Sequence, residues 1–128
     1  MEKKCHLTQK GPKAVGPYST AVECGDVIYL SGMIPIDPST QKIVEGTCAQ
    51  QAARVFANIQ IVLEEMGATM QDALKTTVYL TDLSQFGAVN AIYQEWFGPD
   101  YPARTCVEIS KLPLGAQVEV EVIARRRG

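Results

Sequence analysis

The sequence predicts a single α+β domain over residues 1–128, with two helices covering one face of a mixed β-sheet. Three observations support this fold class. A chain of 128 residues suits one hydrophobic core. Its hydrophobic share of 46% is ordinary for a globular protein. Two long segments carry apolar residues at helical spacing, while shorter segments alternate between polar and apolar residues as strands do.

The predicted elements follow the order β-β-α-β-α-β-β. They are strands over residues 18–23 and 27–31, a helix over 47–66, a strand over 74–81, a helix from 82–84 to 97, and strands over 103–109 and 117–124. Gly25-Asp26 between the first two strands is typical of a tight hairpin turn. Residues 1–16 are expected to form an irregular lead-in and residues 33–46 a long loop, because both contain Gly and Pro.

The first helix has clear signals at both ends. Thr47 and Gln50 have the spacing of a capping box, in which each side chain bonds the backbone of the other residue. Gly67 can end the helix in a left-handed conformation. The apolar stripe of the helix is Ala52, Val55, Phe56, Ile59, Val62, Leu63 and Met66. Such a stripe predicts an amphipathic helix lying on a sheet.

The second helix is expected to begin with Asp82 or Ser84 as its N-cap and to end at Gly98-Pro99. Two helices can cover only one face of a sheet of this size. Alternation along the strands places Tyr79, Ile123 and Val107 on the other face. A half-apolar face of this kind predicts a partner subunit, and we expect a homo-oligomer built around it.

Composition and motifs argue against several classes of function. The sequence opens without an apolar stretch and contains no membrane-span pattern, so a cytoplasmic protein with no membrane partner is expected. The cysteines form no C-x-x-C pair and His6 is the single histidine, so no metal site is expected. Nucleotide-binding glycine motifs are absent as well, and no cofactor is expected. A net charge of −2 disfavours nucleic acid as a partner, although the tail at residues 125–127 is basic and is expected to be a solvated end.

Arg104 is the first candidate for chemistry. It stands in Tyr-Pro-Ala-Arg-Thr-Cys with no acidic residue within three positions. A surface arginine or an inter-subunit ion pair is the structural interpretation. The functional interpretation is a carboxylate receptor, because a guanidinium fork matches a carboxylate with two parallel hydrogen bonds. Cys106, two residues further on, shares its face of the strand, as a buried thiol or as part of a pocket.

A second set of candidates lies on other segments. Glu119 and Glu121 share one face of the last strand, where one carboxylate could activate water and at least one is expected to be solvated. The segments with Tyr18 and with Ser31-Gly32 bracket the first hairpin, where glycine allows a ligand close to the backbone or merely permits a turn. Asn90 lies among apolar residues of the second helix, where a satisfied, partly buried amide is the structural interpretation.

Together these segments resemble the Rid, or reactive intermediate deaminase, family and its RidA branch. The resemblance spans about residues 8–127. It rests on the segments Gly-Pro-Tyr-Ser at 16–19, Leu-Ser-Gly-Met-Ile-Pro at 30–35, Thr-Val-Tyr-Leu-Thr-Asp-Leu at 77–83, Val-Asn at 89–90, Tyr-Pro-Ala-Arg-Thr-Cys-Val-Glu at 101–108, and Val-Glu-Val-Glu-Val-Ile-Ala at 118–124. Two departures, Met33 where the family often has Gln and a short segment before Tyr101, bear on pocket shape and substrate range.

The resemblance implies a chorismate-mutase-like homotrimer with three clefts between subunits. It implies cofactor-free hydrolysis of 2-iminobutanoate, 2-iminopropanoate and their enamine tautomers to 2-oxo acids and ammonia. It also implies a functional link to the pyridoxal-phosphate-dependent dehydratases that release these compounds. By position, Arg104 would bind the substrate carboxylate and Glu119 would activate water. The residues that would line the pocket are Tyr18, Ser31, Gly32, Asn90 and Cys106.

The sequence is also compatible with two other functions. One is a non-catalytic trimer that binds 2-oxo acids or amino acids as a sensor or a chaperone-like partner. It shares Arg104 with the enzyme hypothesis but does not need Glu119. The other is a ribonuclease or translation inhibitor, an activity ascribed to some relatives. The negative net charge and the lack of interleaved basic and aromatic residues disfavour it.

Overall fold

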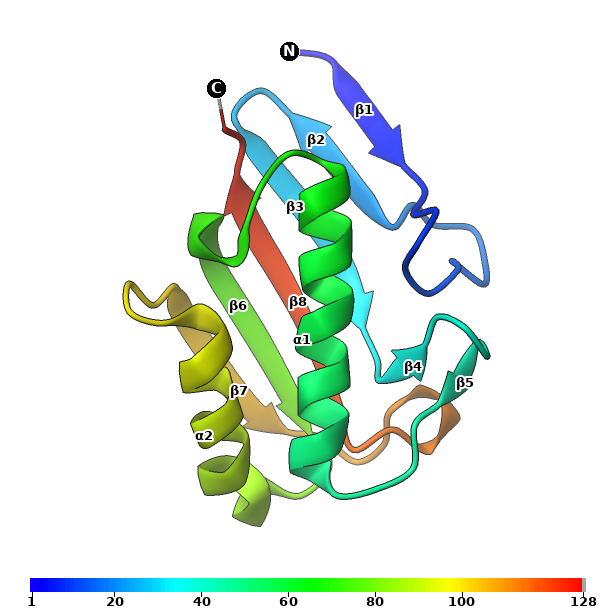
Figure 1. Cartoon of the computed structure of the whole chain (residues 1–128), viewed down its shortest axis with the longest axis vertical. Helices are drawn as coiled ribbons and strands as arrows, with labels where there is room; N and C mark the ends of the chain where they lie inside the picture. Colours follow the sequence, from blue (N-terminus) through cyan, green and yellow to red (C-terminus); the bar gives the residue numbers. More distant parts are fainter. Residues whose placement is uncertain (128) are drawn as a thin grey trace.

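The computed structural model describes residues 1–127 and shows one sheet with two helices against one of its faces (Figure 1). The strands are β1 (Lys3–His6), β2 (Ala21–Cys24), β3 (Val27–Met33), β6 (Ala73–Leu80), β7 (Ala103–Glu108) and β8 (Val118–Arg125). Their order across the sheet is β1-β2-β3-β8-β6-β7. The β6–β7 pair is parallel and the other pairs are antiparallel, so the sheet is mixed, as predicted.

Two predictions about irregular segments are wrong. Residues 3–6 form β1, which pairs with β2 at the edge of the sheet. A glutamate on the first helix secures the chain after β1, because Glu65 accepts hydrogen bonds from His6, the Thr8 hydroxyl and the backbone of residues 9 and 10. The expected loop at 33–46 contains a small hairpin of β4 (Ile36–Asp37) and β5 (Lys42–Ile43).

The predicted first helix, α1 (Cys48–Glu65), has the expected capping box. The Thr47 hydroxyl accepts from the Gln50 backbone at 3.2 Å, and the Gln50 side chain accepts from the Thr47 backbone at 2.8 Å. Gly67 follows the helix with φ of 77°, a left-handed conformation. These bonds satisfy backbone groups that a helix end leaves without partners.

The second helix, α2 (Phe86–Phe97), has its N-cap position at Gln85, one to three residues later than predicted. Asp82 does accept a hydrogen bond from the Ser84 backbone, but it caps a short 3₁₀ turn, Leu83–Gln85, that leads into α2. The helix ends at Gly98, as predicted. Its buried residues Val89, Tyr93 and Phe97 face α1 and the sheet.

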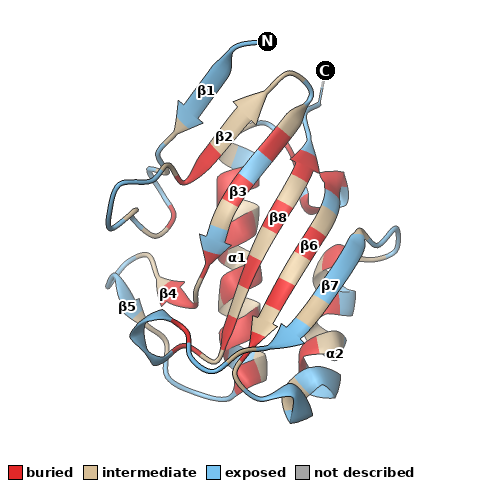
Figure 2. Ribbon diagram, turned by 180° about the vertical axis from the view of Figure 1, so that it is seen from behind, coloured by how far each residue is buried: buried red, intermediate tan, exposed pale blue. Residues whose placement is uncertain are grey.

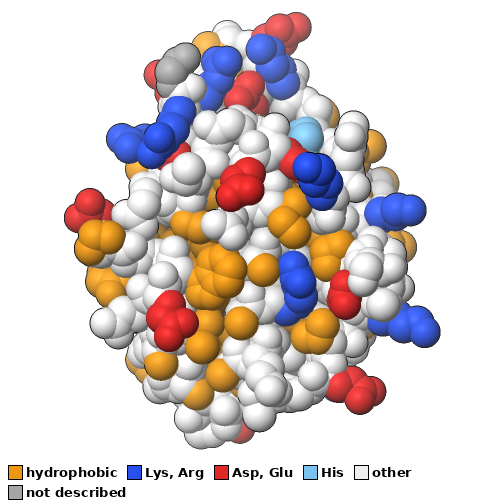
Figure 3. Space-filling model, in the orientation of Figure 1, with side chains coloured by type: hydrophobic (Ala, Val, Ile, Leu, Met, Phe, Trp, Pro, Cys, Tyr) orange, Lys and Arg blue, Asp and Glu red, His pale blue; other side chains and the backbone are white. Residues whose placement is uncertain are grey.

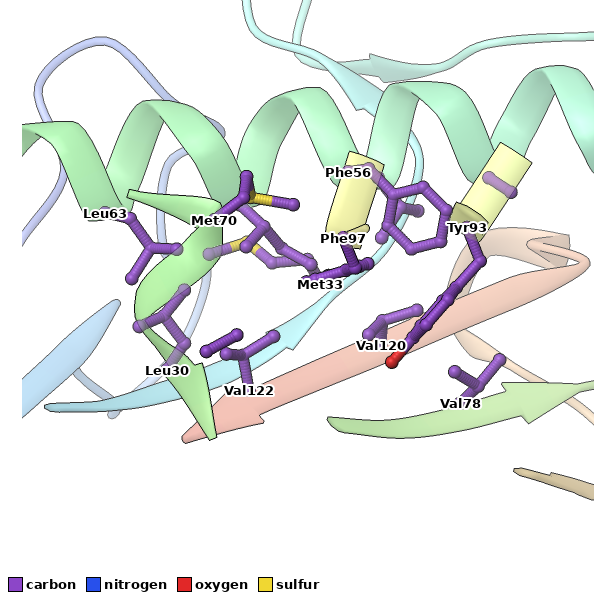
Figure 4. Packing of buried hydrophobic residues seen from close by; sticks show 14 of the residues in the cluster. Leu30, Met33, Phe56, Leu63, Met70, Val78, Tyr93, Phe97, Val120 and Val122 are labelled. Carbon is purple, nitrogen blue, oxygen red and sulfur yellow. The ribbon is translucent and has the colours of Figure 1, made fainter. Parts of the chain in front are cut away.

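The core lies between the helices and the sheet. Figure 4 shows Phe56 of α1 packed beside the α2 residues Tyr93 and Phe97, above valines of β8 and β6. The Phe56 ring meets the other two rings edge to face, with centroids 5.8 Å and 5.3 Å away. This arrangement brings the positive ring edge to the negative ring face. The core therefore fixes the position of α2 over β6 and β7.

The opposite face of the sheet has no layer over it within residues 1–127 (Figure 2). Buried and partly buried residues alternate along β8 and β6, and the partly buried ones point to this open face. Tyr79 and Ile123 are half-buried on it, and Val107 is 37% exposed, as the alternation predicted. Leu74 departs from the predicted alternation because the β6–β8 register shifts between residues 73 and 75, which leaves Leu74 47% exposed.

The basic carboxy-terminal tail is exposed to solvent, as the sequence suggested, but its arginines also form ion pairs. Asp72 is fully buried and accepts from the Arg125 guanidinium at 2.9 Å and from the Arg127 guanidinium at 2.7 Å. Arg126 pairs with Glu23 at 3.3 Å. The three exposed arginines therefore also attach the end of β8 to neighbouring elements.

Candidate functional site

Arg104 lies at the start of the edge strand β7 and turns toward α2. Its Nη1 atom donates a hydrogen bond to Asn90 Oδ1 at 2.7 Å. The guanidinium carbon lies 4.8 Å from the centre of the Tyr93 ring and 5.3 Å from that of Phe86. These contacts are cation–π interactions, which hold the charged group over the aromatic faces. The amide and the two rings therefore fix the direction in which the guanidinium points.

A cavity of about 310 Å³ opens in front of this arginine. Its lining consists of Asn90, Tyr93, Gln94, Tyr101, Pro102 and Arg104. Among residues 1–127, no carboxylate forms an ion pair with Arg104. A guanidinium with one neutral hydrogen-bond partner retains donors for a carboxylate. The cavity therefore has the chemistry of an anion receptor.

Cys106 lies two residues beyond Arg104 on the same face of β7 and packs against the core. Burial raises the pKa of its thiol, and the charge of Arg104 offsets this only in part. The group is therefore a neutral thiol at neutral pH and a poor nucleophile. This state does not suit covalent chemistry, and within one chain Cys106 is not among the residues that line the cavity.

Glu119 lies on the opposite face of the sheet from Arg104. Its neighbours on β8, Val118 and Val120, are buried toward the helices, so the Glu119 side chain points to the open face. Burial raises the pKa of its carboxyl group, and the charge of Glu121 raises it further. A carboxyl group shifted upward in this way accepts and returns a proton more readily near neutral pH.

Glu121 lies on the same open face but already has a hydrogen-bond partner. It accepts a hydrogen bond from the Tyr79 hydroxyl at 2.8 Å. This bond raises the pKa of the Tyr79 phenol, because it favours the protonated form. The two glutamates therefore differ: Glu121 is fixed by a neighbouring strand, whereas no side chain within residues 1–127 donates a hydrogen bond to Glu119.

Three further candidates gather at the end of β3, near Glu119. The Ser31 hydroxyl donates to the carbonyl of Ser19 at 2.7 Å, which ties the segment that follows Tyr18 to β3. Gly32 lies directly against Glu119, since a Cβ atom on Gly32 would be 2.5 Å from Glu119 Oε2. Glycine is thus required for the carboxylate to lie over the backbone at this point. Tyr18, Ser31 and Gly32 also line one side of a large hollow.

Within one chain, the predicted site residues therefore form two separate groups. Arg104, Asn90 and Cys106 lie on the helix side of β7. Tyr18, Ser31, Gly32 and Glu119 lie around the end of β3 and on the open face. Sequence reasoning did not single out several residues that shape these groups, namely Tyr93, Phe86, Tyr101 and Leu114. The sequence signals for them were the helical spacing of Phe86 and Tyr93 on the apolar stripe of the second helix, and the position of Tyr101 in the block before Arg104.

No group of three or more His, Cys, Asp or Glu side chains within residues 1–127 is arranged to hold a metal ion. Over the same range, neither helix combines the length and hydropathy that crossing a membrane requires.

Known proteins match this chain along almost its whole length. A family model described as Endoribonuclease L-PSP matches residues 8–126. A RutC family protein of Pyrococcus abyssi is 48% identical over 124 residues, which cover 97% of this chain and 98% of the relative. A Salmonella typhimurium protein named 2-iminobutanoate/2-iminopropanoate deaminase is 40% identical over 127 residues, with 97% and 98% of the two chains covered.

A solved structure agrees with these sequence matches. The Rid family protein YyfA of Yersinia pestis superposes with a TM-score of 0.94 at 42% identity, over 97% of this chain and 99% of that one. The two helices on a mixed sheet are thus the fold of a known α+β class. The chain belongs to the Rid family.

Proposed function

We propose that this protein hydrolyses 2-imino acids to 2-oxo acids and ammonia without a cofactor, in clefts that two subunits of a homotrimer form together. One observation carries the proposal: the carboxylate receptor Arg104 and the acid–base candidate Glu119 lie on opposite faces of the sheet in one chain. Neither half suffices for the reaction alone. A neighbouring subunit that covers the open face would bring its own Arg104 toward this chain's Glu119.

The surfaces support such an interface. The open face carries the apolar residues Tyr79, Ile123 and Val107, and exposed apolar patches are typical of subunit contacts. Arg104 lies on an edge strand, where a second chain can approach. The two halves of the site lie on different surfaces of the chain, so the contact between subunits joins one kind of surface to the other, head to tail. Contacts of this kind generate closed rings when the rotation between subunits closes. The resemblance to RidA proteins favours a ring of three.

The proposed reaction begins with binding of the substrate carboxylate. The Arg104 fork would hold it through paired, charge-assisted hydrogen bonds while Asn90 keeps the fork in place. Holding the substrate in one orientation contributes to rate, because it replaces a chance encounter with a fixed geometry. The imine carbon would then face the Glu119 carboxylate of the neighbouring subunit.

Glu119 would supply the acid–base chemistry. It would take a proton from water as the water oxygen bonds to the imine carbon, and the nitrogen would gain a proton to give a tetrahedral carbinolamine. The carbon–nitrogen bond would then break as the hydroxyl proton leaves, which releases ammonia and the 2-oxo acid. A carboxyl group with a raised pKa suits this role, since it must both accept and donate a proton near neutral pH.

The Salmonella relative named as a 2-iminobutanoate/2-iminopropanoate deaminase supports this substrate class. The family description also contains the word endoribonuclease. An RNA-cleaving activity has weaker support, because the net charge is −2 and charges of both signs are scattered over the helix face (Figure 3). Affinity for nucleic acid depends mainly on clustered basic side chains.

The direct test adds the protein to a pyridoxal-phosphate-dependent threonine dehydratase that is converting threonine. Loss of 2-aminocrotonate and 2-iminobutanoate is followed with and without a chelator, and light scattering gives the oligomeric state. We expect a particle of about three times 14.0 kDa, faster imine loss and no effect of the chelator. A trimer that leaves the decay rate unchanged would refute catalysis and favour the ligand-binding function instead. A monomer at micromolar concentration would remove the shared clefts.

A further inference from the structure

A large hollow lies at the end of β3, and most of its surface is apolar. It measures about 390 Å³, within the range of ligand-binding pockets. It is lined by Pro12, Lys13, Ala14, Val15, Tyr18, Thr20, Ser31, Gly32, Met33, Ile34, Ile36, Pro113 and Leu114. From this hollow we infer that the protein prefers 2-imino acids with bulky apolar side chains over those with a methyl or ethyl group. The inference rests on the proposed function.

Two hydroxyl groups at the hollow already bond to the protein, and Lys13 is the one charged residue of the lining. The Ser31 hydroxyl donates to the Ser19 carbonyl at 2.7 Å. The Thr20 hydroxyl oxygen accepts from the Thr8 backbone at 3.0 Å. Neither hydroxyl is therefore directed by its bonding toward a polar ligand. The surface left to a ligand consists mainly of aliphatic carbon, which favours an apolar group.

The hollow adjoins the proposed reacting centre. Gly32 lines the hollow and also lies directly beneath the Glu119 carboxylate. A substrate whose imine carbon faces Glu119 therefore has the hollow beside it. The carboxylate end is assigned to Arg104 of the neighbouring subunit, so the side chain is the part of the substrate left to enter the hollow.

The floor of the hollow is held in place before any ligand binds. Asn58 is fully buried on α1 and donates to the Ile36 carbonyl at 2.8 Å. The Arg54 guanidinium in turn donates to Asn58 Oδ1 at 3.1 Å. A pocket that is formed in advance avoids the entropy cost of ordering its walls on binding.

The rim exposes large apolar side chains to solvent. Val15 is 84% exposed and Leu114 is 71% exposed. Leu114 also has a φ of 58°, a left-handed conformation that strains a leucine. Such exposure and strain are unfavourable for the chain alone. A bulky substrate side chain between these residues would remove their apolar surface from water and offset part of the cost of that exposure.

The test uses wild-type protein, the double variant V15S/L114S and the control Leu7→Ser. Leu7 is 64% exposed but lies outside the hollow. Its substitution by serine therefore makes the same apolar-to-polar change at a different surface site. An L-amino-acid oxidase supplies the imines of leucine and of alanine, and kcat/KM is measured for each. Calorimetry measures binding of 4-methyl-2-oxopentanoate and of pyruvate, the corresponding products.

We expect the leucine-derived imine to exceed the alanine-derived one in kcat/KM by about tenfold or more, as an apolar pocket discriminates between side chains of different size. The double variant should reduce this ratio several-fold, and Leu7→Ser should leave the ratio unchanged. Equal kcat/KM for the two imines in the wild type, or a ratio of the two values that V15S/L114S does not alter, would overturn the inference.

The binding measurement separates this inference from the proposed function. If 4-methyl-2-oxopentanoate binds more tightly than pyruvate and V15S/L114S loses this difference, the hollow does bind bulky apolar side chains. This result would stand even if no imine were hydrolysed, and in that case only the deaminase proposal would be refuted. Hydrolysis of both imines at equal rates with equal product binding would overturn the hollow's role and leave the deaminase proposal intact.

Discussion

Exchanging each of the two glutamates on β8 for glutamine separates a catalytic from a structural carboxylate. Glu119→Gln and Glu121→Gln are matched variants, since both residues lie on the same face of the same strand. Alternate residues of a strand are roughly 6.5–7 Å apart along it. A general base must lie within about 3 Å of its water, so one water molecule cannot be served directly by both.

The structure assigns different roles to the pair. Glu121 accepts a hydrogen bond from the Tyr79 hydroxyl at 2.8 Å, whereas Glu119 lies against Gly32, which lines the hollow. We expect Glu119→Gln to slow turnover by about 10²-fold or more, the usual consequence of losing a general base. A factor of 10² corresponds to about 2.7 kcal/mol in activation free energy. Glu121→Gln should change turnover little, because glutamine can still accept the tyrosine hydrogen bond.

The pH dependence provides a second measurement of the same assignment. Catalysis as proposed requires Glu119 to be ionised, and its raised pKa moves the acid limb of kcat/KM above the ordinary glutamate value of about 4.3. Glu121→Gln removes the charge of Glu121, one of the two causes of the raised pKa, so the acid limb should move to lower pH. Glu119→Gln should abolish this limb.

The assay is imine loss for both variants side by side, with oligomeric state checked by light scattering and binding of a 2-oxo acid by calorimetry. Glu119→Gln should keep its oligomeric state and its ligand while losing turnover. Equal losses for the two variants, or a larger loss for Glu121→Gln, would refute the assignment of Glu119 as the base.

Three further changes test other parts of the molecule. Arg104→Lys should cost about 2–5 kcal/mol of transition-state binding, because lysine lacks the planar fork, and normal turnover would place the carboxylate elsewhere. Gly32→Ala should reduce kcat because its Cβ would displace the Glu119 carboxylate, which lies within 2.5 Å of that position; unchanged kcat would contradict the proposed geometry. Asp72→Asn should lower the free energy of unfolding at pH 7 by about 1–3 kcal/mol, since it weakens charge-assisted hydrogen bonds from Arg125 and Arg127. Burial alone would raise the pKa of Asp72, but its hydrogen bonds, first of all the one from Arg125, hold that pKa below its usual range. The stabilisation by ionised Asp72 is therefore fully present above the unfolded-state pKa of about 3.9, and it is lost as the pH falls through the lower pKa of the folded state. Urea unfolding of the wild type and of Asp72→Asn at pH 7 and in acid measures this difference in the free energy of unfolding. The same difference at both pH values would contradict the ion-pair account.

Local sequence signals predicted the elements whose geometry depends on neighbouring residues. The capping box at Thr47 and the Gly25-Asp26 turn are such cases, because side chain and backbone interact within a few positions. The alternation along β8 placed Glu119 and Glu121 on one face for the same reason.

Elements that depend on distant contacts were missed. Lys3–His6 has no apolar alternation, and it forms a strand because β2 and Glu65 offer hydrogen-bond partners more than ten residues away. The ion pairs of the basic tail were missed because their partner, Asp72, is 53 and 55 residues away in the sequence from Arg125 and Arg127.

The candidate site shows the same limit. The sequence placed Arg104 and Cys106 together, since both lie on one strand. It did not show that Arg104 and Glu119 face opposite sides of the sheet. That relation depends on how β7 and β8 each pair with β6, and on the rings and amide of α2 that draw Arg104 to the helix side.

The central claim is that each active cleft takes Arg104 from one subunit and Glu119 from another. It is tested most directly by mixing Arg104→Ala with Glu119→Gln, each inactive alone, and refolding the equimolar mixture. Random assembly pairs an intact Arg104 with an intact Glu119 across about a quarter of the interfaces, so about a quarter of wild-type activity should return. A refolded mixture of mixed oligomers that stays as inactive as either variant alone would contradict the shared cleft.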